Sequence, residues 1–151
     1  MQLILFTGIP ASGKSLFYKQ RYADTHVRIN LDMLRTRNRE SILFRACLEG
    51  KAQVVVDNTN LTRAMRADYI RKARMNHFTV HGFYFEADVG TALRINAARQ
   101  EPMRVPDVAI LSAAKQLEPP VFEEGYDQLS VVQFQYEDGA FQVKEYCREI
   151  W

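Results

Sequence analysis

The residues FTGIPASGKSLFYK (6–19) contain two glycines, Gly8 and Gly13, followed directly by Lys14 and Ser15. This spacing matches G-x-x-x-x-G-K-[ST], the pattern of a phosphate-binding loop, which follows a buried strand and opens a helix. An apolar run too short for a core helix precedes the loop, and a helix-compatible segment follows it. A plain Gly-Ser surface turn would explain the glycines but not these neighbours.

The backbone of this loop is suited to binding phosphate oxygens. Glycine permits close approach and unusual dihedral angles, and the positive end of the helix dipole adds attraction for anions. The residues expected to surround the phosphates are Gly8, Ala11, Ser12, Gly13, Lys14 and Ser15. Lys14 is expected to reach the β and γ phosphates, and the Ser15 hydroxyl to bind Mg²⁺. Because no N-K-x-D sequence is present, we expect ATP rather than GTP.

The composition is that of one globular domain. The chain has 151 residues, of which 47% are hydrophobic and 25% charged, enough for one core but not for two sizeable domains. We therefore expect a single domain over residues 1–151. The net charge of +2 means that an anionic partner must be recognised by local clusters.

The sequence carries none of the expected marks of secretion or membrane insertion. Cys47 and Cys147 lie far apart and form no C-x-x-C pair, so we expect reduced thiols. No basic region precedes the first apolar run, and no run approaches the roughly 18 apolar residues of a membrane span. The prediction is a cytoplasmic protein with no membrane partner.

Continuous apolar runs indicate strands that are buried on both faces, as in a parallel sheet covered by helices. The runs are LILF (3–6), VRIN (27–30), VVVD (54–57) and HGFYF (81–85). Helices are expected between them, over residues 61–75 and 89–99 and from Pro106 and Asp107 onwards. The alternation of strand and helix predicts an α/β fold with a mainly parallel sheet.

Two further expectations concern the surface helix and the C-terminus. The helix over residues 61–75 is expected to keep its basic side chains away from its apolar face; these are Arg63, Arg66, Arg71, Lys72 and Arg74. Residues 130–146 read as a β-hairpin with a two-residue turn at Asp138 and Gly139. This hairpin either completes the sheet or pairs with another chain, and residues 117–127 are expected to form a polar connector.

Polar residues follow two of the predicted strands. In INLDMLR (29–35), Asp32 and Arg35 are three apart on a nascent helix and would share a face. Asp32 is suited to accept a proton from an attacking hydroxyl, and Arg35 to hold a phosphate of the acceptor. An N-cap aspartate and a solvated arginine explain these two residues equally well.

The segment VVVDNTNL (54–61) places Asn58, Thr59 and Asn60 at the sheet edge where open α/β sheets bind ligands. An ordinary turn that caps the next helix is the competing interpretation. In RINAARQEPMRVP (94–106), Arg94 and Arg99 lie where the chain leaves a helix and passes two prolines. An arginine on such a lid is placed to neutralise phosphate charge during transfer, although a solvated basic loop has the same composition.

Taken in order, GIPASGKS, INLDMLR, VVVDNTNL and NAARQEPMRVP resemble the motifs of the polynucleotide 5′-hydroxyl kinases, and LEPPVFEEGYDQL (117–129) resembles the tail of their metazoan-type kinase domains. The resemblance covers residues 3–132. It implies a P-loop kinase fold and transfer of the ATP γ-phosphate to 5′-hydroxyl ends of DNA or RNA, with Mg²⁺.

Residue roles follow from this resemblance position by position. Lys14 and Asp32 correspond to the phosphate-binding lysine and the general base, and Arg99 to the lid arginine on ATP. Arg35 and Thr59 correspond to residues at the acceptor's 3′ phosphate. Asn60 and Arg94 complete the expected acceptor contacts, and the lid is expected over residues 99–106.

The sequence departs from the family at the lid. Relatives often have arginine directly before the Asn-Ala pair, and here that residue is Ile95. Either Arg94 substitutes for it from one position earlier or an acceptor contact is missing.

Two other functions remain open at this stage. A small-molecule kinase would phosphorylate a nucleoside, sugar or antibiotic hydroxyl, and would have no use for Arg35 with Thr59. A nucleotide-binding module without turnover would need neither Asp32 nor Arg99.

The chemistry of phosphoryl transfer predicts an order of mutational effects. The transition state is loose, so charge neutralisation by Lys14 and Arg99 should contribute most of the acceleration, whereas a general base contributes about 10²- to 10⁴-fold. Lys14→Ala and Arg99→Ala are each expected to lower kcat/KM for phosphoryl transfer at least as much as Asp32→Ala. A larger loss in Asp32→Ala than in both others would contradict this order.

Overall fold

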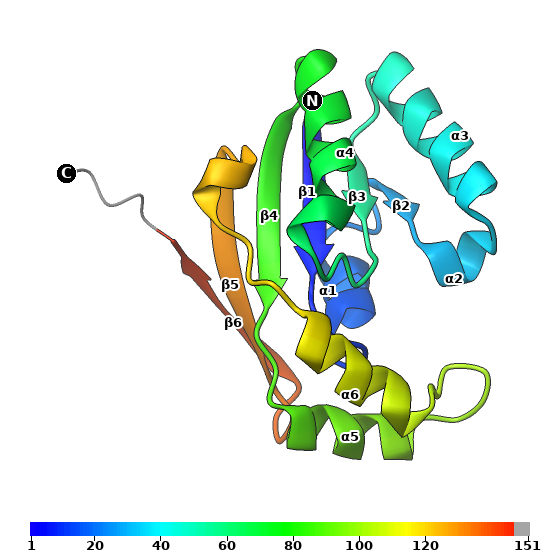
Figure 1. The fold of residues 1–151 in the computed structure, drawn as a ribbon, viewed down its shortest axis with the longest axis vertical. Helices are drawn as coiled ribbons and strands as arrows, with labels where there is room; N and C mark the ends of the chain where they lie inside the picture. Colours follow the sequence, from blue (N-terminus) through cyan, green and yellow to red (C-terminus); the bar gives the residue numbers. More distant parts are fainter. Residues whose placement is uncertain (147–151) are drawn as a thin grey trace.

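The computed structural model describes residues 1–146, which form an α/β fold around one six-stranded sheet (Figure 1). The strands are β1 (Gln2–Thr7), β2 (Val27–Ile29), β3 (Val54–Val56), β4 (Thr79–Phe85), β5 (Gln128–Gln135) and β6 (Ala140–Glu145). Their order is β2-β3-β1-β4-β5-β6, and all pairs are parallel except β5 with β6. The predicted fold class, including the C-terminal hairpin, is confirmed.

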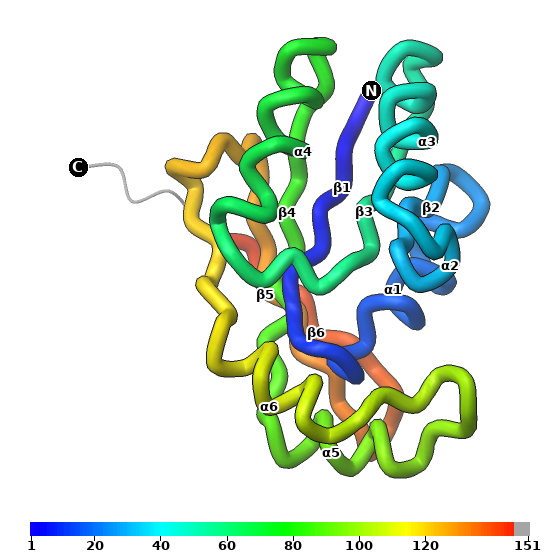
Figure 2. The backbone as a smooth tube through the Cα atoms, turned by 45° about the vertical axis from the view of Figure 1, so that its right-hand side comes forward, coloured from blue at the N-terminus to red at the C-terminus, as the bar shows by residue number. Residues whose placement is uncertain are grey.

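Helices cover both faces of the sheet and its carboxyl edge. They are α1 (Lys14–Arg21), α2 (Leu31–Leu34), α3 (Arg37–Glu49), α4 (Arg63–Met75), α5 (Val89–Ala98) and α6 (Asp107–Gln116), with a 3₁₀ turn η1 (Phe122–Glu124). Helices α3 and α4 lie on one face and α1 on the other, while α5 and α6 pack beyond the strand ends (Figures 1 and 2).

The continuous apolar runs of the strands are explained by burial on both faces. In β1, Leu3 and Leu5 face the core under α3 and α4, whereas Ile4 and Phe6 face the core around α1. All four side chains are fully buried. A strand of this kind cannot alternate apolar with polar residues, so the pattern seen in the sequence reports the parallel, doubly covered sheet.

The C-terminal hairpin completes the sheet. β5 pairs in parallel with β4, and β6 then turns back antiparallel to β5. The predicted two-residue turn is wrong: the last pair is Gln135 with Ala140, so the loop has the four residues 136–139, and Gly139 takes φ 69°. Cys147 lies outside the described residues, and Cys47 is a buried free thiol.

Two elements differ from the sequence prediction. Most of the long helix α3 was not predicted. The connector after α6, expected to be an irregular polar segment, contains the turn η1. The segment after β3 caps α4, as the interpretation of it as an ordinary turn predicted. The Thr62 side chain accepts a hydrogen bond from the Met65 N–H at 3.2 Å. Within residues 1–146, no helix combines the length and hydropathy needed to cross a bilayer.

The expectation that Arg66 lies with the exposed basic residues of α4 is wrong. Its side chain is fully buried and forms a two-pronged ion pair with Glu124 of η1, at 2.8 Å from Nε to Oε1 and 3.0 Å from Nη2 to Oε2. It also donates to the carbonyl oxygens of Asn60 and Leu61. The pair therefore fixes α4, η1 and the loop after β3 to one another. The Arg66 side chain can be buried because it pairs with the Glu124 carboxylate, which lies 58 residues further along the chain.

Replacing Arg66 by Met is expected to destabilise the fold strongly, because Glu124 is left as a buried unpaired charge. Breaking a buried pair in this way costs about 3–5 kcal/mol. Urea unfolding followed by circular dichroism measures the loss, with the exposed Arg63→Met as the matched control on the same helix. A loss as small as that of the control would refute the structural role of the pair.

Candidate active site at the carboxyl edge of the sheet

The loop between β1 and α1 folds around the Lys14 side chain. The Lys14 ammonium donates to the carbonyl oxygens of Gly8 at 3.0 Å and Ile9 at 2.7 Å, and contacts the Ser12 hydroxyl at 3.3 Å. The side chain is buried within its own loop. The structure therefore holds the lysine at the start of α1, where the helix dipole favours an anion.

Both glycines of the motif have steric reasons to be glycine. A Cβ on Gly8 would lie 2.8 Å from the Phe85 Cβ of β4. Gly13 has φ 96°, and a Cβ there would lie 2.9 Å from the Phe141 ring of β6. The C-terminal hairpin, which lies outside the family resemblance, thus packs directly against the phosphate loop.

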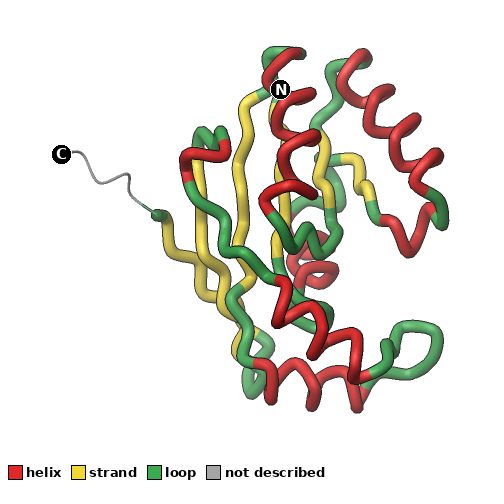
Figure 3. The backbone as a smooth tube through the Cα atoms, viewed as in Figure 1, coloured by secondary structure: helices red, strands yellow, loops and turns green. Residues whose placement is uncertain are grey.

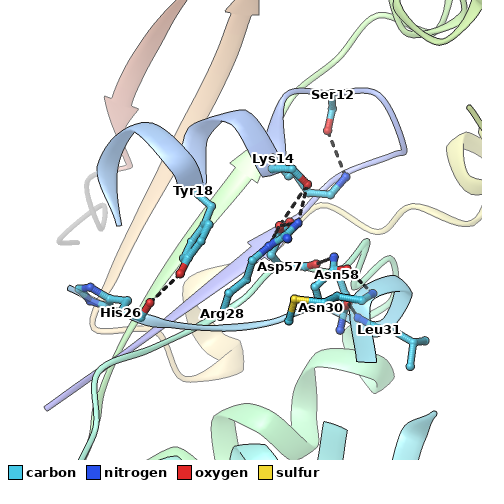
Figure 4. A network of polar contacts seen from close by, with 11 residues as sticks. Ser12, Lys14, Tyr18, His26, Arg28, Asn30, Leu31, Asp57 and Asn58 are labelled. Atoms are coloured by element: carbon cyan, nitrogen blue, oxygen red, sulfur yellow. Dashed lines mark hydrogen bonds and ion pairs between the residues drawn. The ribbon is translucent and has the colours of Figure 1, made fainter. Parts of the chain in front are cut away.

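A buried carboxylate, that of Asp57, lies next to Ser15 and against the Arg28 guanidinium, which Figure 4 shows. Asp57, at the end of β3, accepts a hydrogen bond from the Ser15 hydroxyl at 3.2 Å. The Arg28 guanidinium of β2 contacts both groups, at 2.8 Å to Asp57 Oδ2 and 2.9 Å to Ser15 Oγ. Two hard oxygen donors side by side suit Mg²⁺, and in this structure the Arg28 guanidinium pairs with both of them.

This pair of oxygens fits Mg²⁺ only as a partial ligand set. Across the described residues, no three His, Cys, Asp or Glu side chains converge as a metal site. Mg²⁺ in phosphoryl-transfer enzymes keeps waters and takes further ligands from the substrate phosphates. The two side chains therefore match a cation that arrives with the nucleotide.

Asp32 lies in α2, a single helical turn after β2. Its side chain is exposed, and within residues 1–146 its carboxylate has no hydrogen-bond partner. The turn is held by Asn30, whose Oδ1 accepts from the Met33 N–H at 2.9 Å and whose amide donates to the Asp57 carbonyl at 2.6 Å. The carboxylate is therefore open to a substrate, while its backbone is tied to β3.

Arg35 does not share a helical face with Asp32 as the sequence predicted. Helix α2 ends at Leu34, and Arg35 follows with φ 77° and ψ −34°. A non-glycine residue rarely adopts this conformation, which costs on the order of 1–3 kcal/mol. The bend directs α3 away from α2 and leaves the exposed Arg35 at the corner between them.

The segment after β3 divides into residues that face inward and residues that lie at the edge. Asn60 is buried, has φ 44°, and donates to the Phe6 carbonyl of β1 at 2.8 Å. Thr59 is half-buried, and its carbonyl accepts from the Gly8 N–H at 3.0 Å. Both residues support the phosphate loop, and their predicted contacts with substrate stay predictions.

The predicted lid connects α5 to α6 and projects beyond the sheet edge on the same side as α2 (Figures 1 and 3). Asn96 is buried at its base: its amide donates to the Val105 carbonyl at 2.6 Å, and its Oδ1 accepts from the Val105 N–H at 3.0 Å. Arg99 is half-buried at the end of α5, whereas Arg94 is exposed and contacts Thr91.

Two of the predicted catalytic groups, Asp32 and Arg99, carry charges that act on the Lys14 ammonium. Burial lowers the pKa of Lys14 to about 8, and among the charges that act on it Asp57 and Asp32 raise the pKa while Arg99 lowers it. Burial likewise lowers the pKa of Arg99. Residues from three distant motifs therefore share one electrostatic environment around the lysine.

A cavity of about 460 Å³ adjoins the phosphate loop on the side away from α2. It is bounded by Ala11 and Ser12 of the loop, by the start of α5, and by Gln133 and Phe134 of β5. The Gln133 amide donates to the Glu86 carboxylate at 2.9 Å. Its lining is mixed, with the carboxylates of Glu86 and Asp88 and two glutamine amides beside apolar residues such as Ile95 and Phe134. Its volume lies within the range of small-molecule sites and suits a nucleoside.

Residues 35–120 match the AAA domain family. The chain belongs to this family. The match begins after the phosphate loop, so it is independent of the GKS motif. The structure of Chaetomium thermophilum Kti12 in complex with ADP-AlF₃ is similar in fold, with a TM-score of 0.71 over 88% of this chain and 89% of that chain at 17% identity.

Three curated relatives are named as kinases. A bifunctional polynucleotide phosphatase/kinase of Schizosaccharomyces pombe is 27% identical over 91% of this chain and 36% of that protein. A protein of Acanthamoeba polyphaga mimivirus, provisionally given the same name, is 30% identical over 90% of this chain and 34% of its own length. The L-seryl-tRNA(Sec) kinase of Methanococcus maripaludis is 25% identical over 83% of this chain and 56% of that protein.

The first two relatives confirm the family resemblance read from the motifs. The chain spans about a third of the length of these two relatives and about half of the third. The name of the third relative gives a different acceptor, a seryl-tRNA. The relatives therefore agree on a P-loop kinase but not on the molecule that is phosphorylated.

Sequence reasoning noted Asp57 without giving it a role and did not single out Arg28, Asn30 or Glu40. Asp57 carried a signal, since it ends a buried strand at the binding edge. Arg28 and Glu40 carried no such signal. Both are charged residues, and only the tertiary packing decides which side chains lie next to them. The packing of Phe141 on the phosphate loop was equally invisible in the sequence.

The lowered pKa of Lys14 predicts a pH dependence of nucleotide binding. The phosphates bind the ammonium form, so affinity should be highest below the pKa of about 8 and fall by up to about tenfold per pH unit above it. Calorimetric titration with ATP from pH 7 to 9.5 measures this. Lys14→Arg, which stays charged, should lose the slope, and an equal slope in both proteins would contradict the assignment to Lys14.

Proposed function

We propose that this protein is an ATP-dependent kinase that transfers the γ-phosphate to 5′-hydroxyl ends of DNA or RNA. The observation that carries the proposal is the arrangement at the carboxyl edge of the sheet, where the phosphate loop encloses the Lys14 ammonium, Asp57 accepts a hydrogen bond from Ser15, and the α2 turn leaves the Asp32 carboxylate exposed. Two relatives named polynucleotide phosphatase/kinase match over about nine tenths of the chain and support it.

The nucleotide side of the proposed site uses the phosphate loop. The Lys14 ammonium turns from the carbonyl oxygens of Gly8 and Ile9 to the β and γ phosphates, and the N–H groups of Ala11 to Ser15 surround the phosphate oxygens. ATP places its base in the cavity beside Phe134. Arg99 on the lid approaches the phosphates from the opposite side to Lys14.

Ser15 and Asp57 would hold Mg²⁺, Ser15 directly by its hydroxyl and Asp57 by its carboxylate. When bound, Mg²⁺ neutralises charge on the phosphate oxygens. Arg28, which contacts both oxygens in the structure, must then release at least one of them.

The acceptor side of the proposed site begins at α2. The Asp32 carboxylate, exposed and without a partner among the described residues, accepts the proton of the 5′-hydroxyl as that oxygen attacks the γ-phosphorus. Arg35 and Thr59 hold the phosphate on the 3′ side of the same nucleotide. Arg94, exposed at the lid, contacts the acceptor in place of the arginine that Ile95 replaces.

The test is transfer of labelled γ-phosphate from ATP with Mg²⁺ to matched 5′-hydroxyl DNA and RNA oligonucleotides. The 5′-phosphorylated oligonucleotides are the substrate controls. Asp32→Ala is expected to abolish labelling, whereas Asp24→Ala, an exposed aspartate after α1, keeps it. Absence of labelled oligonucleotide with ATP still bound would refute the proposal.

A kinase of a smaller hydroxyl acceptor is the second candidate, because the match to L-seryl-tRNA(Sec) kinase over 83% of the chain gives a relative whose named acceptor is not a 5′-hydroxyl end. Nucleosides and nucleoside 3′-monophosphates separate the two candidates. If Arg35 and Thr59 hold a 3′ phosphate, the 3′-monophosphate is labelled much faster than the nucleoside, and Arg35→Ala removes most of the difference. Equal labelling of both acceptors would favour the smaller-acceptor kinase.

A further inference from the structure

Helix α2 cannot hold its own position. It has four residues, and a single turn gains too few hydrogen bonds to offset the cost of ordering its backbone. Its first N–H groups also need acceptors from outside the helix. The placement of Asp32 and of the strained Arg35 therefore depends on the groups that anchor this turn from neighbouring segments.

One of these anchors is Asn58, which follows β3 (Figure 4). Its Oδ1 accepts a hydrogen bond from the N–H of Leu31, the first residue of α2, at 2.8 Å. Its Nδ2 donates to Glu40 Oε2 at 3.0 Å. The two ends of one amide thus face a backbone donor in α2 and a carboxylate in α3.

Glu40 and the Leu31 N–H select the same orientation of this amide. An ionised carboxylate only accepts hydrogen bonds, so Asn58 must turn its nitrogen toward Glu40 and its oxygen toward Leu31. The flipped amide would place an oxygen against the carboxylate and a nitrogen against the Leu31 N–H. Both contacts would be repulsive, and the buried setting makes unpaired polar groups costly.

Glu40 is itself held firmly. It is 4% exposed, and its other oxygen accepts from the Tyr69 hydroxyl of α4 and from Arg37 Nη1 at 3.1 Å. Burial and this hydrogen bond raise the pKa of Tyr69, which keeps the phenol protonated as a donor. The carboxylate is thereby fixed to α4 as well as to α3.

We propose that Glu40 is a positioning residue for the acceptor side of the site. It orients Asn58, Asn58 holds the first residue of α2, and α2 presents Asp32 and Arg35 beside the cation site at Ser15 and Asp57. The inference rests on the proposed function for the role of Asp32. The side-chain hydrogen bonds of Glu40 and Asn58 run to Leu31, Arg37, Tyr69 and each other, away from the phosphate loop. The effect should therefore fall on transfer and not on ATP binding.

The first arm of the test does not depend on activity. Amide hydrogen exchange is measured in Glu40→Gln and in Glu49→Gln, an exposed glutamate at the end of the same helix. Glutamine offers both a donor and an acceptor, so it no longer selects one orientation of Asn58. We expect exchange at Leu31 to rise about tenfold in Glu40→Gln, with the amides of β3 unchanged and Glu49→Gln like the parent.

The second arm measures steady-state transfer to a 5′-hydroxyl oligonucleotide. Glu40→Gln is expected to lower kcat on the order of 10-fold, as for a misplaced reacting group, with the KM for ATP within about twofold of the parent. Asn58→Leu, which removes both hydrogen bonds, should match or exceed this loss. The double variant should be no worse than Asn58→Leu alone, because both residues act through one path.

The outcomes separate this inference from the proposed function. Unchanged Leu31 exchange in Glu40→Gln, additive losses in the double variant, or equal acceleration at the β3 amides would each overturn the positioning role. Faster Leu31 exchange with unaltered kcat would also overturn it. If the parent protein labels no oligonucleotide, the proposed function fails, while the Leu31 exchange still decides whether Glu40 sets α2.

Discussion

Asp57, through its carboxylate and its backbone together, ties α1, β2 and the start of α2 to the end of β3. It is 1% exposed, yet its side chain holds Ser15 of α1 and Arg28 of β2, its carbonyl holds Asn30 before α2, and its N–H donates to the Ile29 carbonyl. A buried carboxylate is tolerated only when it is paired and hydrogen-bonded. Meeting that requirement fixes the elements of the site around the end of β3.

The phosphate loop and the acceptor side are stabilised by different means. The loop is held by backbone hydrogen bonds and by close packing of Phe85 and Phe141 on its two glycines. The acceptor side is a single turn supported by two asparagine side chains. The groups proposed to meet the acceptor therefore depend on a small polar network, whereas the phosphate loop is held by backbone hydrogen bonds and close packing.

The C-terminal hairpin has a structural role that the family motifs did not suggest. It completes the sheet beside β4, contributes Phe134 to the cavity next to the loop, and places Phe141 against Gly13 and Phe17. The nucleotide site is therefore built partly from residues that come last in the described chain, although the loop itself comes first.

The sequence by itself determined the parallel α/β fold, the phosphate loop and the order of the edge motifs, because doubly buried strands and glycine-lysine spacing leave local patterns. It also proposed roles for Asp32, Thr59 and Arg99, which stay predictions. Only the tertiary structure decided that Arg66 is buried, that Arg35 leaves α2 at φ 77°, and that Arg28 and Glu40 support the site. Arg28 pairs with Asp57, 29 residues away, Glu40 with Asn58, 18 residues away, and Arg66 with Glu124, 58 residues away. No local pattern of charge records such pairing.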